Sequence, residues 1–428
     1  MTPRHVAVVD LGFGDAGKGT TVDRLCARGR ARGRPVHAVI RFNGGAQAAH
    51  NVVTDDGRHH TFAQFGSGTF TPGTRTHLSR FMLVDPLALA AEADHLRALG
   101  VADPLGLLTV DRDALLTTPY HAAANRARES ARGPGRHGSC GMGVGETAAF
   151  ALAHPDLAPR VGDCGAPRLL RRRLNAVREV VSAEFGTPPG PDVEACVAAF
   201  TGFGRAVRAV DGGYTGELLR AGPVVFEGAQ GVLLDEWHGF HPYTTWSTTT
   251  FAGAEALAAE AGEGVYRLGV LRTYTTRHGP GPLPSEDAGL TAALPDPHNG
   301  TGRWQGAFRV GHFDAVAHRY AVAVCGGVDG LALTHADVPG RVPGLGVVRA
   351  YAGPEPWASP VPDLAHAERL TALMSAARPV VEPAPSAAEW PDFAAAELGA
   401  PVTLLSFGPR TGDKRERAVL GSYYSPVT

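Results

Sequence analysis

Short apolar runs alternate with longer alanine-rich stretches along the whole chain. The first run, residues 6–11 (Val-Ala-Val-Val-Asp-Leu), is typical of a short buried strand. A glycine-rich turn follows over residues 12–20, and helical character continues from there to Arg28. The same pattern predicts further strands over residues 36–42, 223–226, 266–271, 330–334 and 401–406, and helices over residues 86–99 and 314–323.

This order of elements predicts an α/β fold. A strand, a glycine-rich turn and a helix are the entry unit of a doubly wound parallel sheet. We therefore expect one large domain, similar to those of phosphate-loop proteins, that spans residues 1–428 around a mostly parallel sheet with long inserted loops and helices. The proline-rich stretches 187–191 and 354–362 are predicted to be loops rather than domain linkers, because strand-like segments resume beyond them.

Composition and charge narrow the classes of partner. The 428 residues carry 40 Lys plus Arg against 42 Asp plus Glu, which gives a formal net charge of −2. This balance argues against general nucleic-acid binding, which needs surplus cationic residues. The arginine-rich run 168–174 is predicted to be a solvated helix face. No apolar run is long enough to predict a membrane span.

Cysteine usage predicts a reducing environment. The five cysteines are odd in number, scattered and without a CxxC pair, which disfavours both a disulfide framework and a structural zinc site. We therefore expect a cytoplasmic protein.

The glycine-rich turn carries the clearest chemical signal. Only two of the 40 cationic residues are lysines, and one of them, Lys18, lies in the sequence Gly12-x4-Gly17-Lys18-Gly19-Thr20. This is nearly the phosphate-loop pattern, with glycine where that pattern has Ser or Thr. Glycines let backbone N–H groups converge on an anion, the helix start adds positive potential, and Lys18 adds a point charge. The turn therefore predicts a phosphate site.

Asp15 is unexpected inside such a loop. A carboxylate beside triphosphate oxygens is repelled unless it binds the accompanying Mg²⁺ or takes part in acid–base chemistry. An ordinary aspartate in a surface turn is the alternative.

Several motifs in a fixed order give the chain a family resemblance. Residues 14–19 (Gly-Asp-Ala-Gly-Lys-Gly), residues 41–50 (Arg-Phe-Asn-Gly-Gly-Ala-Gln-Ala-Ala-His) and residues 226–231 (Phe-Glu-Gly-Ala-Gln-Gly) together resemble adenylosuccinate synthetase. The match continues through later motifs at residues 233–235, 241–245, 276–281, 301–303, 334–337 and 406–409. The resemblance therefore covers nearly the full length.

The resemblance implies a two-step ligation. An enzyme of this family transfers the γ-phosphoryl of GTP to the 6-oxygen of IMP, and the amine of L-aspartate then displaces phosphate. Asp15 matches the base that removes the N1 proton, His50 matches the acid near the transferred phosphoryl, and Gln230 matches the glutamine that holds the purine. Asp15 and Ala49 match the positions that hold Mg²⁺, and a homodimer is expected.

The remaining matched positions divide by substrate. Asp337 is suited to accept both N1–H and the 2-amino hydrogens of guanine, a donor pair that adenine lacks, although a helix N-cap aspartate is the competing explanation. The GTP-binding candidates are Gly14, Gly17, Lys18, Gly19, Asn51, His335, Asp337, Ser406, Gly408 and Pro409. The acceptor-binding candidates are Gln47, Cys140, Gln230, Thr245 and His278, and the aspartate-binding candidates are Thr301, Gly302 and Arg303.

Departures from the family pattern fall mostly on the acceptor. The family's Gly-Thr-Thr-Gly-Arg-Gly loop is Gly-Ser-Cys-Gly-Met-Gly over residues 138–143, which loses one threonine hydroxyl and one arginine. Gln47 replaces an asparagine, and His335 replaces a lysine. The paired arginines that serve the family dimer reduce to Arg160, which matches a later position. Two explanations stay open: a diverged enzyme that still uses IMP, and a paralogue with a modified or non-phosphorylated lactam acceptor in specialised metabolism.

Two other classes of protein also stay open. A GTP-binding switch keeps a nucleotide site without synthesis, and a phosphate-loop kinase releases a phosphorylated product without using aspartate. A switch needs neither a base at Asp15 nor an amino-acid site at Arg303, so the motif set favours the ligase.

Overall fold

One large sheet runs through the centre of the protein. The computed structural model describes residues 4–186, 190–353 and 362–417. The sheet has ten strands in the order β19-β18-β15-β11-β1-β10-β2-β5-β7-β9, and every neighbouring pair is parallel except β18 and β19. The strands are β1 (His5–Asp10), β2 (Ala38–Arg41), β5 (Arg75–Leu78), β7 (Leu108–Asp111), β9 (Arg208–Val210), β10 (Val224–Gly231), β11 (Val265–Arg272), β15 (Gly330–Thr334), β18 (Val402–Ser406) and β19 (Lys414–Glu416).

The central strand β1 is apolar because both of its faces are covered. Val6 and Val8 join Val22 and Leu25 of helix α1 (Lys18–Ala31) in one core cluster. Ala7 and Val9 point to the opposite face and join the cluster that holds helix α10 (Ala315–Val324). Strands buried on both faces have nearly continuous apolar sequences, which explains the pattern of residues 6–9.

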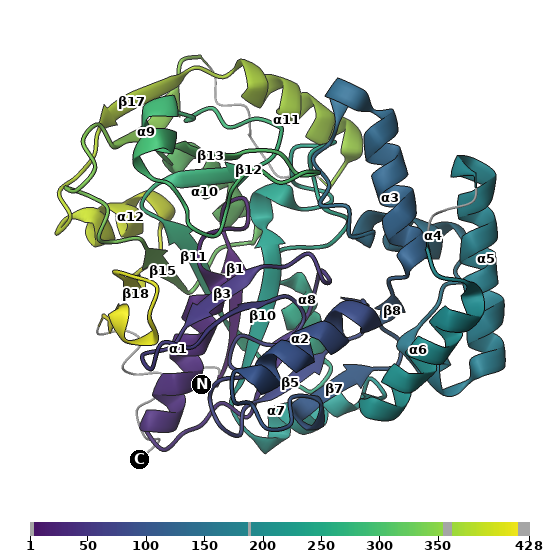
Figure 1. Ribbon diagram of the computed structural model, residues 1–428. Coiled ribbons are helices and arrows are strands. Elements are labelled where there is room, and N and C mark those ends of the chain that lie inside the picture. The colour runs from purple at the N-terminus through teal and green to yellow at the C-terminus, as the bar shows by residue number, and fades with distance from the viewer. Residues whose placement is uncertain (1–3, 187–189, 354–361, 418–428) are drawn as a thin grey trace.

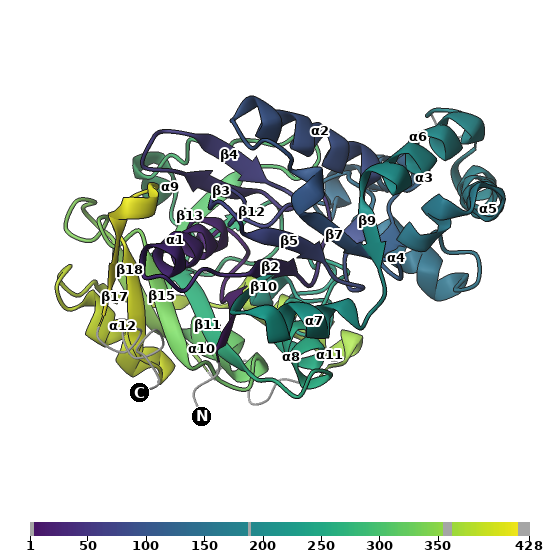
Figure 2. The same ribbon diagram turned by 90° about the horizontal axis from the view of Figure 1, so that it is seen from below.

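The other elements cover the sheet and extend it at both ends. Helices α3–α6 gather at one end of the molecule, while β17, β18 and α12 lie at the other (Figures 1 and 2). The smaller strands are β3 (His50–Val53), β4 (His59–Phe62), β6 (Leu83–Val84), β8 (Leu115–Leu116), β12 (Thr275–His278), β13 (Phe308–Gly311), β14 (Phe313–Asp314), β16 (Gly346–Tyr351) and β17 (Pro379–Pro383). The remaining α-helices are α2 (Pro86–Ala98), α3 (Pro119–Ala131), α4 (Val144–Ala153), α5 (Pro167–Phe185), α6 (Val193–Ala206), α7 (Tyr214–Ala221), α8 (Ala252–Ala259), α9 (Ala288–Ala293), α11 (Leu364–Ala376) and α12 (Trp390–Leu398).

The predicted α/β class and mostly parallel sheet are confirmed, and each predicted strand and helix overlaps an observed one. Helix α1 begins at Lys18, three residues earlier than expected, because the glycine turn runs directly into it. In α5, Leu170 and Leu174 are buried, whereas Arg171 pairs with Glu194 at the surface, as expected for a solvated helix face. Residues 187–189 and 354–361 of the two predicted loops lie outside the described residues.

The structure also bears on the cysteines and on membrane-spanning helices. All five cysteines are free thiols. No helix within the described ranges is long and apolar enough to cross a membrane.

Candidate active site

The phosphate loop follows β1 at the carboxyl edge of the sheet. Gly14 and Gly17 adopt φ angles of 112° and 98°, a left-handed conformation that favours glycine. Gly17 is the N-cap of α1, and no side chain caps the first N–H groups of that helix. Uncapped N–H groups at a helix start, following a glycine turn, are suited to bind an anion, so the predicted phosphate site stays a candidate.

A buried carboxylate fills the inner side of the same loop. Asp10, the last residue of β1, accepts hydrogen bonds from the N–H groups of Gly12 (2.8 Å), Gly14 (3.3 Å) and Ala16 (2.7 Å). It also pairs with the ammonium of Lys18 at 3.2 Å, and that ammonium donates to the carbonyl of Gly14 at 2.6 Å. Lys18 is therefore turned inward and held by the protein.

Asp15 lies half-buried on the open side of the loop. Its carboxylate has no side-chain hydrogen bond or ion pair within the described ranges, and its carbonyl accepts from Nε of Arg272 at 2.6 Å. Burial raises the pKa of this carboxyl, and the nearby charges of Arg272 and Lys18 oppose that rise. Asp15 lines a cavity of about 10 Å³, room for about one water molecule, together with Asp10 and His318. Asp15 is thus placed to act on a ligand rather than to support the fold.

His50 begins β3 and is paired with a carboxylate of the central sheet. Its Nδ1–H donates to Oε1 of Glu227 on β10 at 2.7 Å, and both side chains are buried. Burial lowers the pKa of His50 to about 4, which Glu227 opposes. Burial alone would raise the pKa of Glu227, but the hydrogen bond and charge of His50, with Arg41 and Ser67, hold it at about 2. Glu227 thus fixes the proton on Nδ1 and leaves Nε2 as the reactive nitrogen.

Two glutamines near His50 have unsatisfied amides. Both Oε1 and Nε2 of Gln47 are buried without a hydrogen-bond partner among the described residues, and so is Oε1 of Gln230. Gln230 also adopts a φ of 57°, an uncommon conformation for a residue with a side chain. Buried polar atoms without partners are costly in a finished structure, so both amides are candidates to bind a ligand.

Close backbone approaches bring these loops to one place. A Cβ at Gly19 would lie 2.7 Å from Cβ of His50, which sets the start of α1 directly against β3. A Cβ at Gly44 would lie 3.0 Å from Oε1 of Gln230, and one at Gly14 would lie 3.4 Å from the backbone of Gln230. The loops that carry Asp15 and His50 therefore meet, with Gln230 beside both.

The residues predicted to hold the guanine base lie on two adjoining loops. The N–H of Ala336 donates to the carbonyl of Ser406 at 2.9 Å, which joins the loop after β15 to the loop after β18. The carboxylate of Asp337 pairs with Arg341 at 2.6 Å, and Nδ1 of His335 is hydrogen-bonded to the hydroxyl of Tyr274 at 3.1 Å. Asn51 lies on the β3–β4 hairpin, where its carbonyl oxygen would be 3.2 Å from a Cβ at Gly19 and its Oδ1 accepts from Thr61 at 2.6 Å.

The aspartate candidates lie in the connection between β12 and β13, which begins after the acceptor candidate His278. His278 ends β12, and its Nε2 donates to the carbonyl of Gly306 at 3.1 Å. Gly302 and Gly306 exchange two backbone hydrogen bonds, which closes a tight loop that exposes Arg303. The guanidinium of Arg303 lies 5.1 Å from the ring centroid of Trp304. Of the other candidates, Thr301 is exposed, while Cys140 and Thr245 are half-buried.

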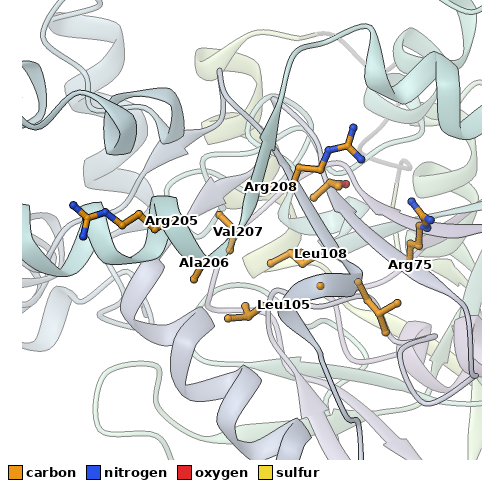
Figure 3. Close-up of a pocket in the computed structure, with 10 residues that line it drawn as sticks. Arg75, Leu105, Leu108, Arg205, Ala206, Val207 and Arg208 are labelled. Carbon is orange, nitrogen blue, oxygen red and sulfur yellow. The ribbon is translucent and has the colours of Figure 1, made fainter.

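A larger cavity of about 290 Å³ lies away from these loops. Arg75 begins β5 and Leu108 begins β7, so this cavity is at the amino edge of the parallel sheet. Figure 3 shows Arg205 pointing away from Arg75 and Arg208. None of the residues predicted for function lines it, so it is separate from the candidate site.

Sequence reasoning gave no role to three supporting residues: Asp10, Glu227 and Arg272. Glu227 stands inside the 226–231 motif, three residues before Gln230, so its position was a usable signal. Asp10 and Arg272 each end a buried strand, where a charged side chain points toward the loops at the carboxyl edge.

Comparison with known proteins shows the family of the chain. The family profile described as adenylosuccinate synthetase matches residues 7–413. The chain is 34% identical over 351 residues to adenylosuccinate synthetase of Anaeromyxobacter sp. (strain K), covering 78% of this chain and 77% of that protein. It is 34% identical over 360 residues to adenylosuccinate synthetase of a Synechocystis species, covering 81% and 78%.

Solved structures share the fold. A fully ligated adenylosuccinate synthetase from Plasmodium falciparum superposes with a TM-score of 0.81 at 19% identity, covering 97% of this chain and 100% of that one. Cyanophage S-2L succinoaminodeoxyadenylate synthetase superposes with a TM-score of 0.61 at 21% identity, covering 99% of each chain. At sequence identities of 19% and 21%, these superpositions show only that the fold is shared. On the profile and the sequence relatives, the chain belongs to the adenylosuccinate synthetase family.

Proposed function

We propose that this protein is a GTP- and Mg²⁺-dependent, GDP-forming carbon–nitrogen ligase. It phosphorylates the 6-oxo group of IMP or an IMP-like purine nucleotide and replaces it with the amino group of L-aspartate, giving adenylosuccinate or an analogue. One observation carries the proposal: a phosphate loop, the His50–Glu227 pair and the unpartnered amide of Gln230 converge on one place. A membership in this family makes the protein a ligase, and the proposal adds its substrates.

Asp15 starts the first step. A lactam oxygen becomes a competent nucleophile when the N1 proton leaves, and Asp15 takes that proton. Its raised pKa makes it a stronger base than an ordinary carboxylate. The 6-oxygen then forms a bond to the γ-phosphorus, the bond from that phosphorus to the bridging oxygen breaks, and GDP leaves.

His50 stabilises the charge that moves during this transfer. A triphosphate near Nε2 favours the protonated imidazole, and the ionised Glu227 at Nδ1 favours it further. A donor fixed in advance where negative charge develops lowers the barrier without reorganisation. His50 therefore acts as the acid, oriented by Glu227.

Magnesium fits the donors at this site. Within the described ranges no group of three or more His, Cys, Asp or Glu side chains could hold a metal ion by itself. Mg²⁺ is commonly bound by one or two carboxylates together with substrate phosphates, and the unpaired carboxylate of Asp15 suits that role. Ala49 offers only its main-chain carbonyl. The ion supplies charge neutralisation of the triphosphate when bound.

The second step replaces the phosphoryl group. The amine of aspartate attacks C6, the C6–N bond forms, the C6–O bond breaks, and inorganic phosphate carries away the oxygen. The exposed guanidinium of Arg303, with Thr301 and Gly302, is suited to hold the aspartate carboxylates beside His278. Asp337 and residues 406–409 bind the guanine base from the other side, with Asp337 exchanging Arg341 for guanine N–H groups.

A second acceptor class has one observation in its favour. Three arginines in or directly after α3, the helix that precedes the 138–143 loop, are already held by the protein: Arg126 by the carbonyl of Gly141 in that loop, Arg128 by Glu146 and Arg132 by Glu129. Because these guanidinium groups already have protein partners, they are less available to bind a phosphate monoester near the 138–143 loop. This favours an acceptor without a 5′-phosphate. The cyanophage synthetase of the same fold was solved with dGMP and dATP, so members of the fold differ in substrates.

Phosphate release under defined substrates tests the proposal. With GTP and Mg²⁺, we expect inorganic phosphate only when both aspartate and an acceptor are present. IMP is tried first, followed by inosine and base-modified relatives. Phosphate release from GTP alone would instead identify a switch, and a phosphorylated acceptor formed without aspartate would identify a kinase.

The setting of the enzyme is proposed on the same basis. We propose that residues 1–428 act as one unit, in the cytoplasm, as a homodimer, with small-molecule substrates and without nucleic acid or membrane partners. Light scattering during size-exclusion chromatography tests the dimer directly.

A further inference from the structure

Lys414, the second of the two lysines in the chain, lies outside the phosphate loop that contains Lys18. Lys18 and Lys414 are the only lysines among 40 cationic residues. Lys414 begins the edge strand β19 and is 3% exposed, far from the reacting groups of the phosphate loop in sequence. Because nearly all other cationic residues of the chain are arginines, a buried lysine indicates that this position needs an ammonium group rather than a guanidinium group.

The contacts of Lys414 give that reason. Its ammonium donates to three successive main-chain carbonyls, those of Gly408 (3.2 Å), Pro409 (3.1 Å) and Arg410. An ammonium has three hydrogens on one atom, so three converging oxygens satisfy it fully. A guanidinium is a planar fork and cannot point its donors at three oxygens around one centre. The 408–410 segment is therefore wrapped around a lysine.

The same loop is fastened to the elements on either side of the nucleotide site. Thr20 at the start of α1 donates to the carbonyl of Pro409 at 3.2 Å, and Thr411 donates to Asp23 of α1 at 2.6 Å. The N–H of Gly412 donates to Asp55, in the turn between β3 and β4, at 2.7 Å. The loop thus joins α1 to the β3–β4 turn, and Ser406, directly before it, accepts from the N–H of Ala336 in the loop that carries Asp337.

We infer that Lys414 is a positioning residue for the guanine base of GTP. By tying together the carbonyls of residues 408–410, it holds that segment in the shape that closes on the base, and it acts on the nucleotide only through this segment. The inference rests on the proposed function, which assigns the base to Asp337 and residues 406–409.

Lys414 also makes the segment sensitive to pH. Burial lowers its pKa to about 8, a shift that the carboxylates of Asp23, Asp413 and Asp55 oppose and that Arg24 reinforces. The ammonium is charged below that pH and fills all three carbonyls. As pH rises through about 8 it loses its charge and one hydrogen, so one carbonyl is left without a donor. Order in the 408–410 segment falls with it.

The test compares Michaelis constants across pH for the full-length protein. Lys414→Arg and Lys414→Met are expected to raise KM for GTP at pH 7 by about tenfold, while kcat and KM for aspartate change by less than about threefold. The wild-type KM for GTP should rise between pH 7 and 9, and both variants should lose that dependence. Arg417→Met removes an equal charge from the end of the same strand, where Arg417 pairs with Asp392, and should leave every constant unchanged.

Other outcomes overturn the inference. A variant with wild-type KM for GTP, or one in which the constants for GTP and aspartate rise together, shows that Lys414 only supports the fold. A wild-type KM for GTP that stays constant between pH 7 and about 8.5 also overturns the inference, and this measurement needs no variant. Calorimetric titration with GTP and Mg²⁺ separates the two proposals: if no acceptor is ever consumed but GTP binds with the same pH dependence, the ligase assignment fails and the role of Lys414 stands.

Discussion

The two sides of the candidate site differ in how complete they are. On the phosphate side, Asp10 accepts hydrogen bonds from three loop N–H groups and pairs with Lys18. Lys414 donates hydrogen bonds to the main-chain carbonyls of residues 408–410. On the acceptor side, the amides of Gln47 and Gln230 have no partners within the described ranges. In the first region the chain itself satisfies most polar groups and leaves the N–H groups at the start of α1 uncapped, whereas in the second region the side-chain amides lack partners. We therefore expect changes on the two sides to affect different substrates.

The largest effect is expected where the two sides meet, at Asp15. Asp15→Asn keeps the size of the side chain and removes the base, so kcat should fall by about 10³-fold, within the range for general base catalysis. GTP affinity measured without Mg²⁺ should change little, because the uncapped N–H groups at the start of α1 remain. Single-turnover phosphate release measures the first, and equilibrium binding of GTP measures the second. A variant that retains the wild-type rate removes Asp15 from the mechanism.

Glu227→Gln breaks the link between His50 and the central sheet. The amide retains the packing but loses the charge that favours a protonated imidazole, so kcat should fall by about 10²-fold. Because the two residues act as one unit, the double variant with His50→Gln should be no worse than His50→Gln alone. Additive losses in kcat would show that Glu227 acts independently of His50.

Asp10→Asn tests the phosphate side of the comparison. An amide cannot accept from all four donors, so some loop N–H groups or Lys18 lose a partner. We expect the free energy of unfolding to fall by about 1–3 kcal/mol. KM for GTP should rise by about tenfold while KM for aspartate stays constant. Urea denaturation and steady-state kinetics measure these effects. Equal increases in KM for GTP and KM for aspartate would mean that the phosphate loop also affects aspartate binding.

Gln47→Ala tests the acceptor side and has the smallest expected effect. No protein hydrogen bond is lost within the described ranges, so the melting temperature should be unchanged or slightly higher. KM for the acceptor should rise by about fivefold to tenfold, which corresponds to one neutral hydrogen bond. Gln305→Ala, in the neighbouring 301–306 loop, is the matched control. A fall in stability without a change in acceptor KM would contradict the assignment of Gln47.

The sequence predicts the central strands well because burial on both faces leaves a continuous apolar signature, as in residues 6–9. It predicts much less of helices α3–α6, whose core is built from residues far apart in the chain, such as Phe62, Leu89 and Phe200. Local patterns cannot reveal which of these segments meet. Residues that lie in a motif, such as Lys18 and His50, could be proposed from the sequence as site candidates.

Supporting residues were harder to find for a physical reason. Glu227, Asp10 and Lys414 act through contacts with other protein groups, so their identity depends on three-dimensional neighbours rather than on spacing. The sequence predicts that Lys18 supplies a point charge to the phosphate site, but a phosphate-loop pattern says nothing about an aspartate eight residues earlier. The paired state of Lys18 follows only from the fold.

Gly19 has a consequence beyond its place in the phosphate loop. Its missing side chain is the space that His50 occupies, so the separation between the base-bearing and acid-bearing segments is set by a single absent methyl group. The Cβ of an alanine at this position would clash with His50 and push the two segments apart, without changing any of the proposed reactive groups. The alignment of the proposed base Asp15 and the proposed acid His50 thus depends on the absence of a side chain at Gly19.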